Sequence, residues 1–234
     1  MNRAHVLRRT AVALALALCL TVSAVGGASA DSAVRRSAPN DKGLISITFD
    51  DGPHPKYTRE ILDILDEYGA HATFFVIGSN AEAHPELLKE IVERGHEIGN
   101  HTYSHQTISK VSDNKITDEL TRTQKIISSA CGFNPVVFRP PGGAYSNRSL
   151  AAVTNLGFAC VTWSKDSNDW RMLPVETIVK NMTTDVQSGD IFLFHDFNRR
   201  GSPTPEAVSQ ILDTLRSQGY SFVTVSELLG QQTA

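Results

Sequence analysis

The stretch that decides the fold is Leu44-Ile45-Ser46-Ile47-Thr48-Phe49-Asp50-Asp51-Gly52. Residues 44–49 are mostly β-branched or apolar and predict a β-strand that ends at two carboxylates. Apolar residues then recur at helical spacing over 61–68, and Gly69 predicts the end of that helix. A strand followed directly by a helix is the first unit of an alternating α/β fold.

The same alternation continues to the end of the chain. Further strands are predicted at 72–77, 96–100, 136–139, 158–163, 190–195 and 220–223, and helices at 85–94, 116–132, 146–157, 175–186, 204–218 and 226–229. Seven such units in series predict one α/β domain with a parallel sheet, either closed as a barrel or wound as an open sheet. Neither GxGxxG after the first strand nor GxxxxGK[ST] occurs, which excludes a dinucleotide site and a P-loop.

The composition is that of a globular protein without a nucleic-acid partner. Lys+Arg number 22 and Asp+Glu 25, which gives a net charge of −3 and no broad basic surface. Hydrophobic residues make up 41% and charged residues 20% of the 234 positions, which excludes a disordered chain. A chain of this length fits one domain with a sizeable core.

The first thirty residues have the pattern of a secretory signal peptide. Arg3, Arg8 and Arg9 precede an apolar run over 11–25 that is too short to span a bilayer, and Ala28-Ser29-Ala30 is a small-residue cleavage site. The alternative is an uncleaved N-terminal anchor. We therefore predict a signal peptide at 1–30, a short leader at 31–43 and the catalytic domain at 44–234. The mature protein is expected to be secreted and free of membrane association.

Two cysteines remain after this cleavage, Cys131 and Cys160. An even pair in an exported protein predicts one disulfide. The alternative is a pair of small buried thiols.

Polar side chains gather where the predicted strands end. In parallel α/β folds the carboxyl ends of the strands share one edge, where active sites lie, so these clusters are expected to form a single site. The clusters are Asp50 and Asp51, His101 and His105, Arg139, then Asp166, Asp169 and Trp170, and finally His195.

The residue types at this edge predict a metal-assisted hydrolase. His101 and His105 are spaced i, i+4, so on a helical turn they share a face and can bind one ion. One aspartate of the Asp50-Asp51 pair would complete three protein ligands, as in catalytic zinc sites. The other aspartate is then free to accept a proton from the attacking water.

Four further residues have roles that suit such a reaction. His195 is interpreted as a general acid for the leaving group, and Asp169 can orient an imidazole. Arg139 ends its strand with a fork of donors that can clamp a carboxylate. Trp170 is either an apolar wall for a sugar face or a core residue.

Five motifs occur in order: TFDDG at 48–52, HTYSH at 101–105, RPPGG at 139–143, DSNDW at 166–170 and LFH at 193–195. Together they resemble the motifs of the NodB-like polysaccharide deacetylases, carbohydrate esterase family 4, over Leu44 to Leu229. The resemblance implies a distorted (β/α)7 barrel. It also implies a divalent metal, zinc with cobalt as an alternative, bound by Asp51, His101 and His105.

The resemblance further implies a role for each remaining site residue. Asp50 would be the general base and His195 the general acid, with Arg139 tethering Asp50 and Asp169 orienting His195. Leu193 would line the pocket for the acetyl methyl group. Gly142 stands where the family often has Tyr; its backbone N–H can still hold the oxyanion, and Tyr145 is a candidate for the missing phenol.

The function implied by the resemblance is that of a deacetylase, and with the signal peptide we expect a secreted protein that is a monomer. Its substrate would be an acetylated polysaccharide, with N-acetyl groups removed from β-1,4-linked N-acetylglucosamine polymers such as peptidoglycan or chitin. An O-acetyl esterase on acetylxylan would use the same atoms. A catalytically silent wall-binding module is a third reading, disfavoured because the base, the ligands and the acid are all present. A two-metal phosphoesterase lacks enough additional ligands.

Overall fold

The structure is a computed structural model that describes residues 34–197 and 201–230. The predicted signal peptide and the start of the predicted leader lie outside the described residues. The strands are β1 Val34–Arg35, β2 Leu44–Asp50, β3 Ala72–Val76, β4 Glu97–Asn100, β5 Val137–Phe138, β6 Ala159–Val161, β7 Lys165–Asp166, β8 Ile191–His195 and β9 Ser221–Phe222. The helices are α1 Tyr57–Tyr68, α2 Gly78–Ala83, α3 Pro85–Glu93, α4 Asp113–Cys131, α5 Asn147–Asn155, α6 Val175–Thr183, α7 Thr204–Ser217 and α8 Val225–Leu228.

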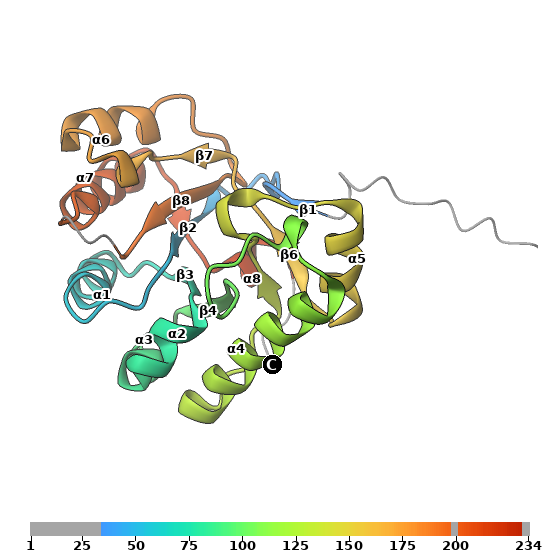
Figure 1. Cartoon of the computed structure of the whole chain (residues 1–234). Coiled ribbons are helices and arrows are strands. Elements are labelled where there is room, and N and C mark those ends of the chain that lie inside the picture. The colour runs from blue at the N-terminus through green and yellow to red at the C-terminus, as the bar shows by residue number, and fades with distance from the viewer. Residues whose placement is uncertain (1–33, 198–200, 231–234) are drawn as a thin grey trace, which may run out of the picture.

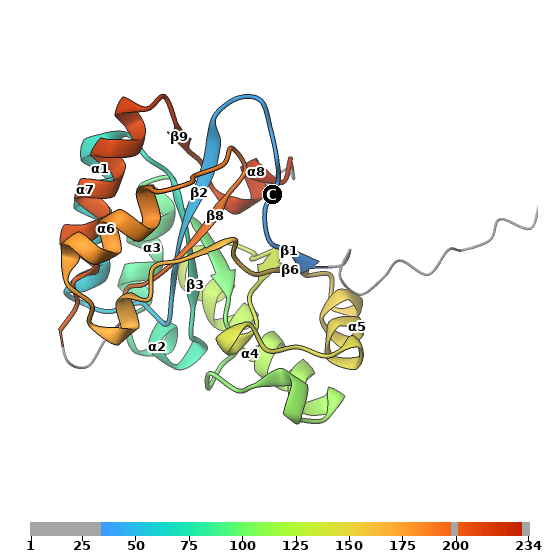
Figure 2. The ribbon, with the colours of Figure 1, turned by 90° about the horizontal axis from the view of Figure 1, so that it is seen from above.

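The strands form one curled parallel sheet in the order β1-β6-β5-β4-β3-β2-β8-β7, with β9 paired to the start of β2. Helices α1, α3, α4, α5, α6 and α7 lie around its outside (Figures 1 and 2). Over the described ranges, no helix is both long and apolar enough to cross a membrane. The predicted fold class, an α/β distorted (β/α)7 barrel, is confirmed, and each predicted strand and helix is present with ends shifted by a few residues.

Alternation along the strands divides the core into an outer and an inner layer. Phe74 and Phe192 point outward and pack with the helices α1, α3 and α7. Phe75 and Ile191, their neighbours in sequence, belong to a separate cluster with Val225 and Leu228 of α8. Helix α8 therefore closes the interior at the amino ends of the strands and leaves the carboxyl ends open for a site.

The segment predicted as a leader takes part in closing the sheet. Val34 pairs with Cys160 of β6, while Ser37 forms an antiparallel bridge with Asp190, the residue before β8. Gly189 makes this approach feasible, because it has a φ of +96° and a Cβ there would lie 2.2 Å from the carbonyl oxygen of Ala38. The two sides of the curled sheet are thus joined through residues 34–38.

The predicted disulfide is wrong, and the alternative of two thiols is confirmed. Cys131 and Cys160 are both free. Cys131 ends α4, where its thiol donates to the carbonyl of Ile127 at 3.2 Å and packs against the outer core. Cys160 is buried in a different cluster, beside Phe138 and Val34. Burial raises the pKa of Cys160 to about 12, so this thiol is an inert core group.

Candidate functional site

The site lies at the carboxyl ends of the parallel strands. β2 is central, and its last residue, Asp50, is the register partner of His195 on β8 and of Phe75 on β3. A cavity of about 330 Å³ opens here, lined by Asp50, Asp51, His101, His105, Gly142, Trp163, Asp166, Trp170, Leu193 and His195. Arg139 and Asp169, the other two predicted site residues, contact Asp50 and His195 respectively. The topology therefore brings all the predicted side chains together.

Asp51, His101 and His105 form a cluster suited to a metal ion. One ligand atom from each lies within 4.8 Å of the others. Asp51 Oδ1 is 3.2 Å from His105 Nε2 and 3.5 Å from His101 Nε2. His101 Nδ1 lies 2.7 Å from the Arg139 carbonyl oxygen and donates to it, which leaves Nε2 free to bind a cation.

The electrostatics of this cluster also fit a cation. Burial lowers the pKa of His101, which favours the neutral, metal-binding imidazole. Burial alone would raise the pKa of Asp51, but His105, His101 and His195 together lower it to about 2. Among the described residues, none donates a well-oriented hydrogen bond to the buried Asp51 Oδ1. An ionised carboxylate oxygen without a donor, beside two imidazole nitrogens, is the donor set of a zinc-type site.

The helical turn expected for 101–105 is wrong. The segment is an irregular loop after β4, in which Thr102 and His105 have left-handed φ angles of 66° and 56°. The two rings nevertheless converge, with centroids 5.2 Å apart. The two predicted histidines therefore lie close together through the path of this loop and not through helical geometry.

Asp50 is held by a buried arginine. Arg139 Nη1 donates to Asp50 Oδ1 at 2.8 Å and to Thr48 Oγ1 at 2.6 Å, and Nη2 donates to the Thr162 carbonyl at 3.0 Å. The guanidinium has no exposed surface and lies 4.1 Å above the Phe75 ring centroid. Asp50 is therefore fixed in orientation, and its negative charge is compensated inside the barrel.

His195 is oriented by Asp169 from the opposite side of the cavity. Its Nδ1 lies 2.7 Å from Asp169 Oδ1, and its backbone N–H donates to Oδ2 at 2.8 Å. Thr204 Oγ1 also donates to Oδ2, at 2.7 Å. Burial opposes protonation of His195, but the hydrogen bond and charge of Asp169, with the charges of Asp50 and Asp51, raise its pKa to about 9. At neutral pH His195 is an imidazolium and can give up a proton.

The raised pKa of His195 predicts a pH-dependent stability. Because the pKa rises from 6.5 to about 9 on folding, the stabilisation is complete below pH 6.5 and is lost as the pH rises through 9. It is worth up to about 3 kcal/mol. We expect the unfolding free energy of the metal-free protein to fall across this window, and Asp169→Asn to remove most of the slope. Urea unfolding at several pH values measures it; equal slopes in the two proteins would contradict the assignment.

The predicted substrate-contacting residues line the same cavity from three sides. Leu193, from β8, is 3% exposed, and Trp170 is 57% exposed on the turn after β7. The exposure of Trp170 removes the alternative of a core residue. Gly142 has a φ of +62°, and a Cβ on it would meet no atom within 4 Å. The cavity wall is therefore open where the family often has Tyr, while the hydroxyl of Tyr145 accepts from Arg36 Nη2 at 3.1 Å.

Three residues near the site were not singled out from the sequence. Trp163 lines the cavity, and its position at the end of a predicted strand was an available signal. Thr48 and Thr204 hold Arg139 and Asp169, and neither is distinguishable in sequence from an ordinary strand or helix-start threonine. Their roles follow only from the folded arrangement.

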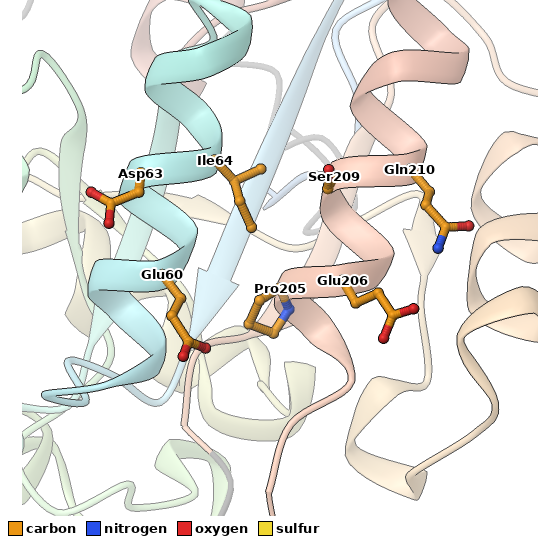
Figure 3. Close-up of a pocket in the computed structure, with 7 residues that line it drawn as sticks. All are labelled: Glu60, Asp63, Ile64, Pro205, Glu206, Ser209 and Gln210. Atoms are coloured by element: carbon orange, nitrogen blue, oxygen red, sulfur yellow. The ribbon is translucent and has the colours of Figure 1, made fainter.

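A second cavity lies on the outside of the barrel, between α1 and α7 (Figure 3). It is lined by Glu60, Asp63 and Ile64 of α1 and by Pro205, Glu206, Ser209 and Gln210 of α7, with the Ile64 side chain directed toward α7. None of the predicted site residues lines it, and its carboxylates are surface groups without a histidine, a cysteine or a basic partner among the lining residues. The predicted site residues gather at the sheet edge instead.

Comparisons with known proteins agree with this geometry. The sequence model of the family described as polysaccharide deacetylase matches residues 37–161. A peptidoglycan-N-acetylglucosamine deacetylase of Bacillus cereus is 43% identical over 193 residues, which cover 82% of this chain and 90% of the relative.

Two solved structures share the fold. A peptidoglycan N-acetylglucosamine deacetylase has a TM-score of 0.82 at 33% identity, covering 86% of this chain and 94% of the other. A family 4 acetyl xylan esterase from Clostridium thermocellum, in complex with a cobalt ion, has a TM-score of 0.75 at 35% identity, covering 80% and 90%. The chain therefore belongs to the NodB-like polysaccharide deacetylases of carbohydrate esterase family 4, a family of hydrolases whose N-deacetylases act on non-peptide carbon–nitrogen bonds.

Proposed function

We propose that the protein is a secreted, metal-dependent deacetylase that removes N-acetyl groups from N-acetylglucosamine units of a β-1,4-linked polymer, with peptidoglycan as the first substrate. One observation carries the proposal. A carboxylate and an imidazolium, Asp50 and His195, are register partners on adjacent strands and line the cavity that also holds the Asp51, His101 and His105 cluster. A base, an acid and a cation site on one cavity are the parts that amide hydrolysis requires.

Asp50 is proposed to accept the proton of the attacking water. Its Oδ1 is occupied by Arg139, while Oδ2 lies 3.7 Å from His101 Nε2 and faces the cluster. Arg139 thus fixes one carboxylate oxygen and leaves the other directed at the reacting region. This arrangement suits a base whose position must be accurate to within a fraction of an ångström.

The three ligands Asp51, His101 and His105 would hold the cation. Two imidazoles and one carboxylate suit zinc, and cobalt also accepts this donor set. When bound, the cation would supply Lewis acidity that polarises the acetamide carbonyl and lowers the pKa of the attacking water. Three protein ligands leave coordination positions for water and substrate.

His195 is proposed to protonate the departing amine. Its Nδ1 donates to Asp169, so Nε2 carries the proton that the amine receives. The backbone N–H of Gly142 is proposed to contact the oxyanion, and Leu193 to contact the acetyl methyl group. The products are acetate and a glucosamine unit.

The choice of N-acetyl groups and peptidoglycan draws on the Bacillus cereus relative, whose name states that activity. The predicted signal peptide supports action outside the cell, where the polymer is found. The similarity to an acetyl xylan esterase favours a second candidate, O-deacetylation of acetylxylan by the same residues. The complete set of base, acid and ligands argues against the silent wall-binding module.

Acetate release separates these activities. We expect the zinc-loaded protein to release acetate faster from peptidoglycan or chitooligosaccharides than from acetylxylan. A strong chelator should abolish release, and added zinc or cobalt should restore it. Faster release from acetylxylan would favour the esterase, no release from any polymer would favour the silent module, and full activity of a demonstrably metal-free sample would end the metal mechanism.

A further inference from the structure

The loop that carries the two histidines, residues 101–106, is held by contacts from outside it. The N–H groups of Gly78 and Ser79, at the start of α2, donate to the carbonyls of Thr102 and Tyr103 at 2.9 Å each. Two left-handed residues, Thr102 and His105, interrupt regular structure after the His101 N–H, which still donates to the Val76 carbonyl of β3 at 3.1 Å. Its conformation depends on partners that pair with its backbone.

The main partner of the loop's N–H groups is Glu119, on the buried face of α4. Its Oε2 accepts from the backbone N–H of Tyr103 at 2.9 Å and of Ser104 at 2.8 Å. Its Oε1 accepts from Ser104 Oγ at 2.9 Å. The side chain is 1% exposed. One buried carboxylate therefore binds the middle of the segment between His101 and His105.

Lys115, one turn earlier on α4, compensates the charge of Glu119. Lys115 Nζ lies 2.8 Å from Glu119 Oε1. Burial would raise the pKa of Glu119, but the hydrogen bonds from Lys115 and Ser104 lower it below its ordinary value. The group is a carboxylate at neutral pH, and hydrogen bonds from N–H groups to a carboxylate are stronger than those to a neutral acceptor.

His105 depends on this loop more than His101 does. His101 is buried and donates to the Arg139 carbonyl, which fixes its ring independently. The His105 side chain is 45% exposed, and its ion pair and ring contact within the described residues are with the other two proposed ligands, Asp51 at 3.2 Å and the His101 ring at 5.2 Å. The direction of its Cα–Cβ bond, set by the loop backbone, decides where its Nε2 lies.

We propose that Glu119 is a positioning residue of the metal site, which holds the loop so that His105 Nε2 converges with Asp51 and His101 before the cation arrives. The proposal rests on the proposed function only for the identity of the three ligands. Mutation of a residue that hydrogen-bonds to a metal ligand and orients it commonly lowers metal affinity by about 10–100-fold. Glu119 does not contact His105 itself; it binds the backbone N–H groups of Tyr103 and Ser104, in the loop that carries His105.

The experiment measures two quantities for each variant. One is the zinc affinity, from competition with a chromophoric chelator, and the other is the unfolding free energy of the metal-free protein. Glu119→Ala removes the three hydrogen bonds from Tyr103 and Ser104 to the Glu119 carboxylate. Glu119→Asp shortens the side chain by one methylene group and so moves the carboxylate away from the loop. Glu119→Gln keeps an oxygen that can accept both N–H groups. The matched control is Glu97→Ala. Glu97 is also 1% exposed and accepts from Thr73 Oγ1 and from the N–H and Oγ of Ser226, but at the α8 end of the barrel.

We expect Glu119→Ala to weaken zinc binding by about 10–100-fold, with Glu119→Asp also weaker and Glu119→Gln within about threefold of the original protein. Glu97→Ala should lower stability and leave zinc affinity within about twofold. Should the alanine variant fail to fold, Glu119→Asp carries the comparison. Unchanged zinc affinity in the folded Glu119 variants, or an equal loss in Glu97→Ala, overturns the proposal. An original protein that binds no zinc overturns the metal site itself.

Discussion

Replacing Asp50 with asparagine should lower kcat by about 10²–10⁴ while the protein still binds its metal at near-normal stoichiometry. Asparagine keeps the shape of the side chain but cannot accept a proton from water. Asp51, His101 and His105 are untouched by the change, so the cluster that would hold the cation stays complete. Acetate release gives kcat, and metal content after dialysis gives the stoichiometry.

The neighbouring residue supplies the matched control. Asp51→Asn removes the negative charge of the carboxylate that lies beside the two imidazoles, so metal binding itself should weaken, and excess metal should restore part of the activity. The two variants change adjacent residues, and each replaces one carboxylate oxygen by an amide nitrogen. If Asp50→Asn loses the metal while Asp51→Asn retains it at low turnover, the two roles are reversed and our assignment is wrong.

Replacing Arg139 with methionine should destabilise the metal-free protein by about 3–5 kcal/mol, because removing one partner of a buried ion pair leaves the other charge uncompensated. Arg139 has no exposed surface, and its loss would strand the Asp50 carboxylate and the Thr162 carbonyl. Adding Asp50→Asn to this variant should recover part of the loss, since no buried charge is then left unpaired. Urea unfolding at neutral pH provides the comparison.

A surface pair tests whether this loss is specific to burial. Arg59, with a side chain 44% exposed, lies 3.0 Å from Glu90, and Arg59→Met should cost less than about 1 kcal/mol. A cost for Arg139→Met that matches the cost for Arg59→Met would show that the interior pair contributes no more than an exposed one. If the double variant with Asp50→Asn is no more stable than Arg139→Met alone, the lost stability does not come from the ion pair between Arg139 and Asp50.

The elements that the sequence predicts correctly are marked by an apolar run or by apolar residues at helical spacing. The segment over 72–77 is a nearly continuous apolar run, and the segment over 204–218 has apolar residues at helical spacing; both elements appear within a residue or two of the expected ends. Strands β1 and β7, which were not predicted from the sequence, are Val34-Arg35 and Lys165-Asp166 and do not stand in an apolar run. β1 exists because the edge of β6 offers it a partner, and that is a property of the folded sheet.

The candidate site also contains residues that the sequence predicts and residues that only the folded structure identifies. Asp50, His195 and the two histidines were predictable because they follow strands, and parallel strands share an edge. Glu119 was not, since it stands in a helix beside Asp118 and has the pattern of a solvated acidic face. The cysteine prediction failed because an even count says nothing about distance: Cys131 and Cys160 pack in separate clusters.

The register pairing of Asp50 with His195 has a consequence for the order of folding. The first long strand supplies the proposed base and the last long strand the proposed acid, so contacts between residues far apart in the sequence must form before turnover can begin. Contacts of such long sequence separation are slow to form. Secondary structure should therefore return before activity during refolding, and the first appearance of acetate would time the docking of β8 against β2.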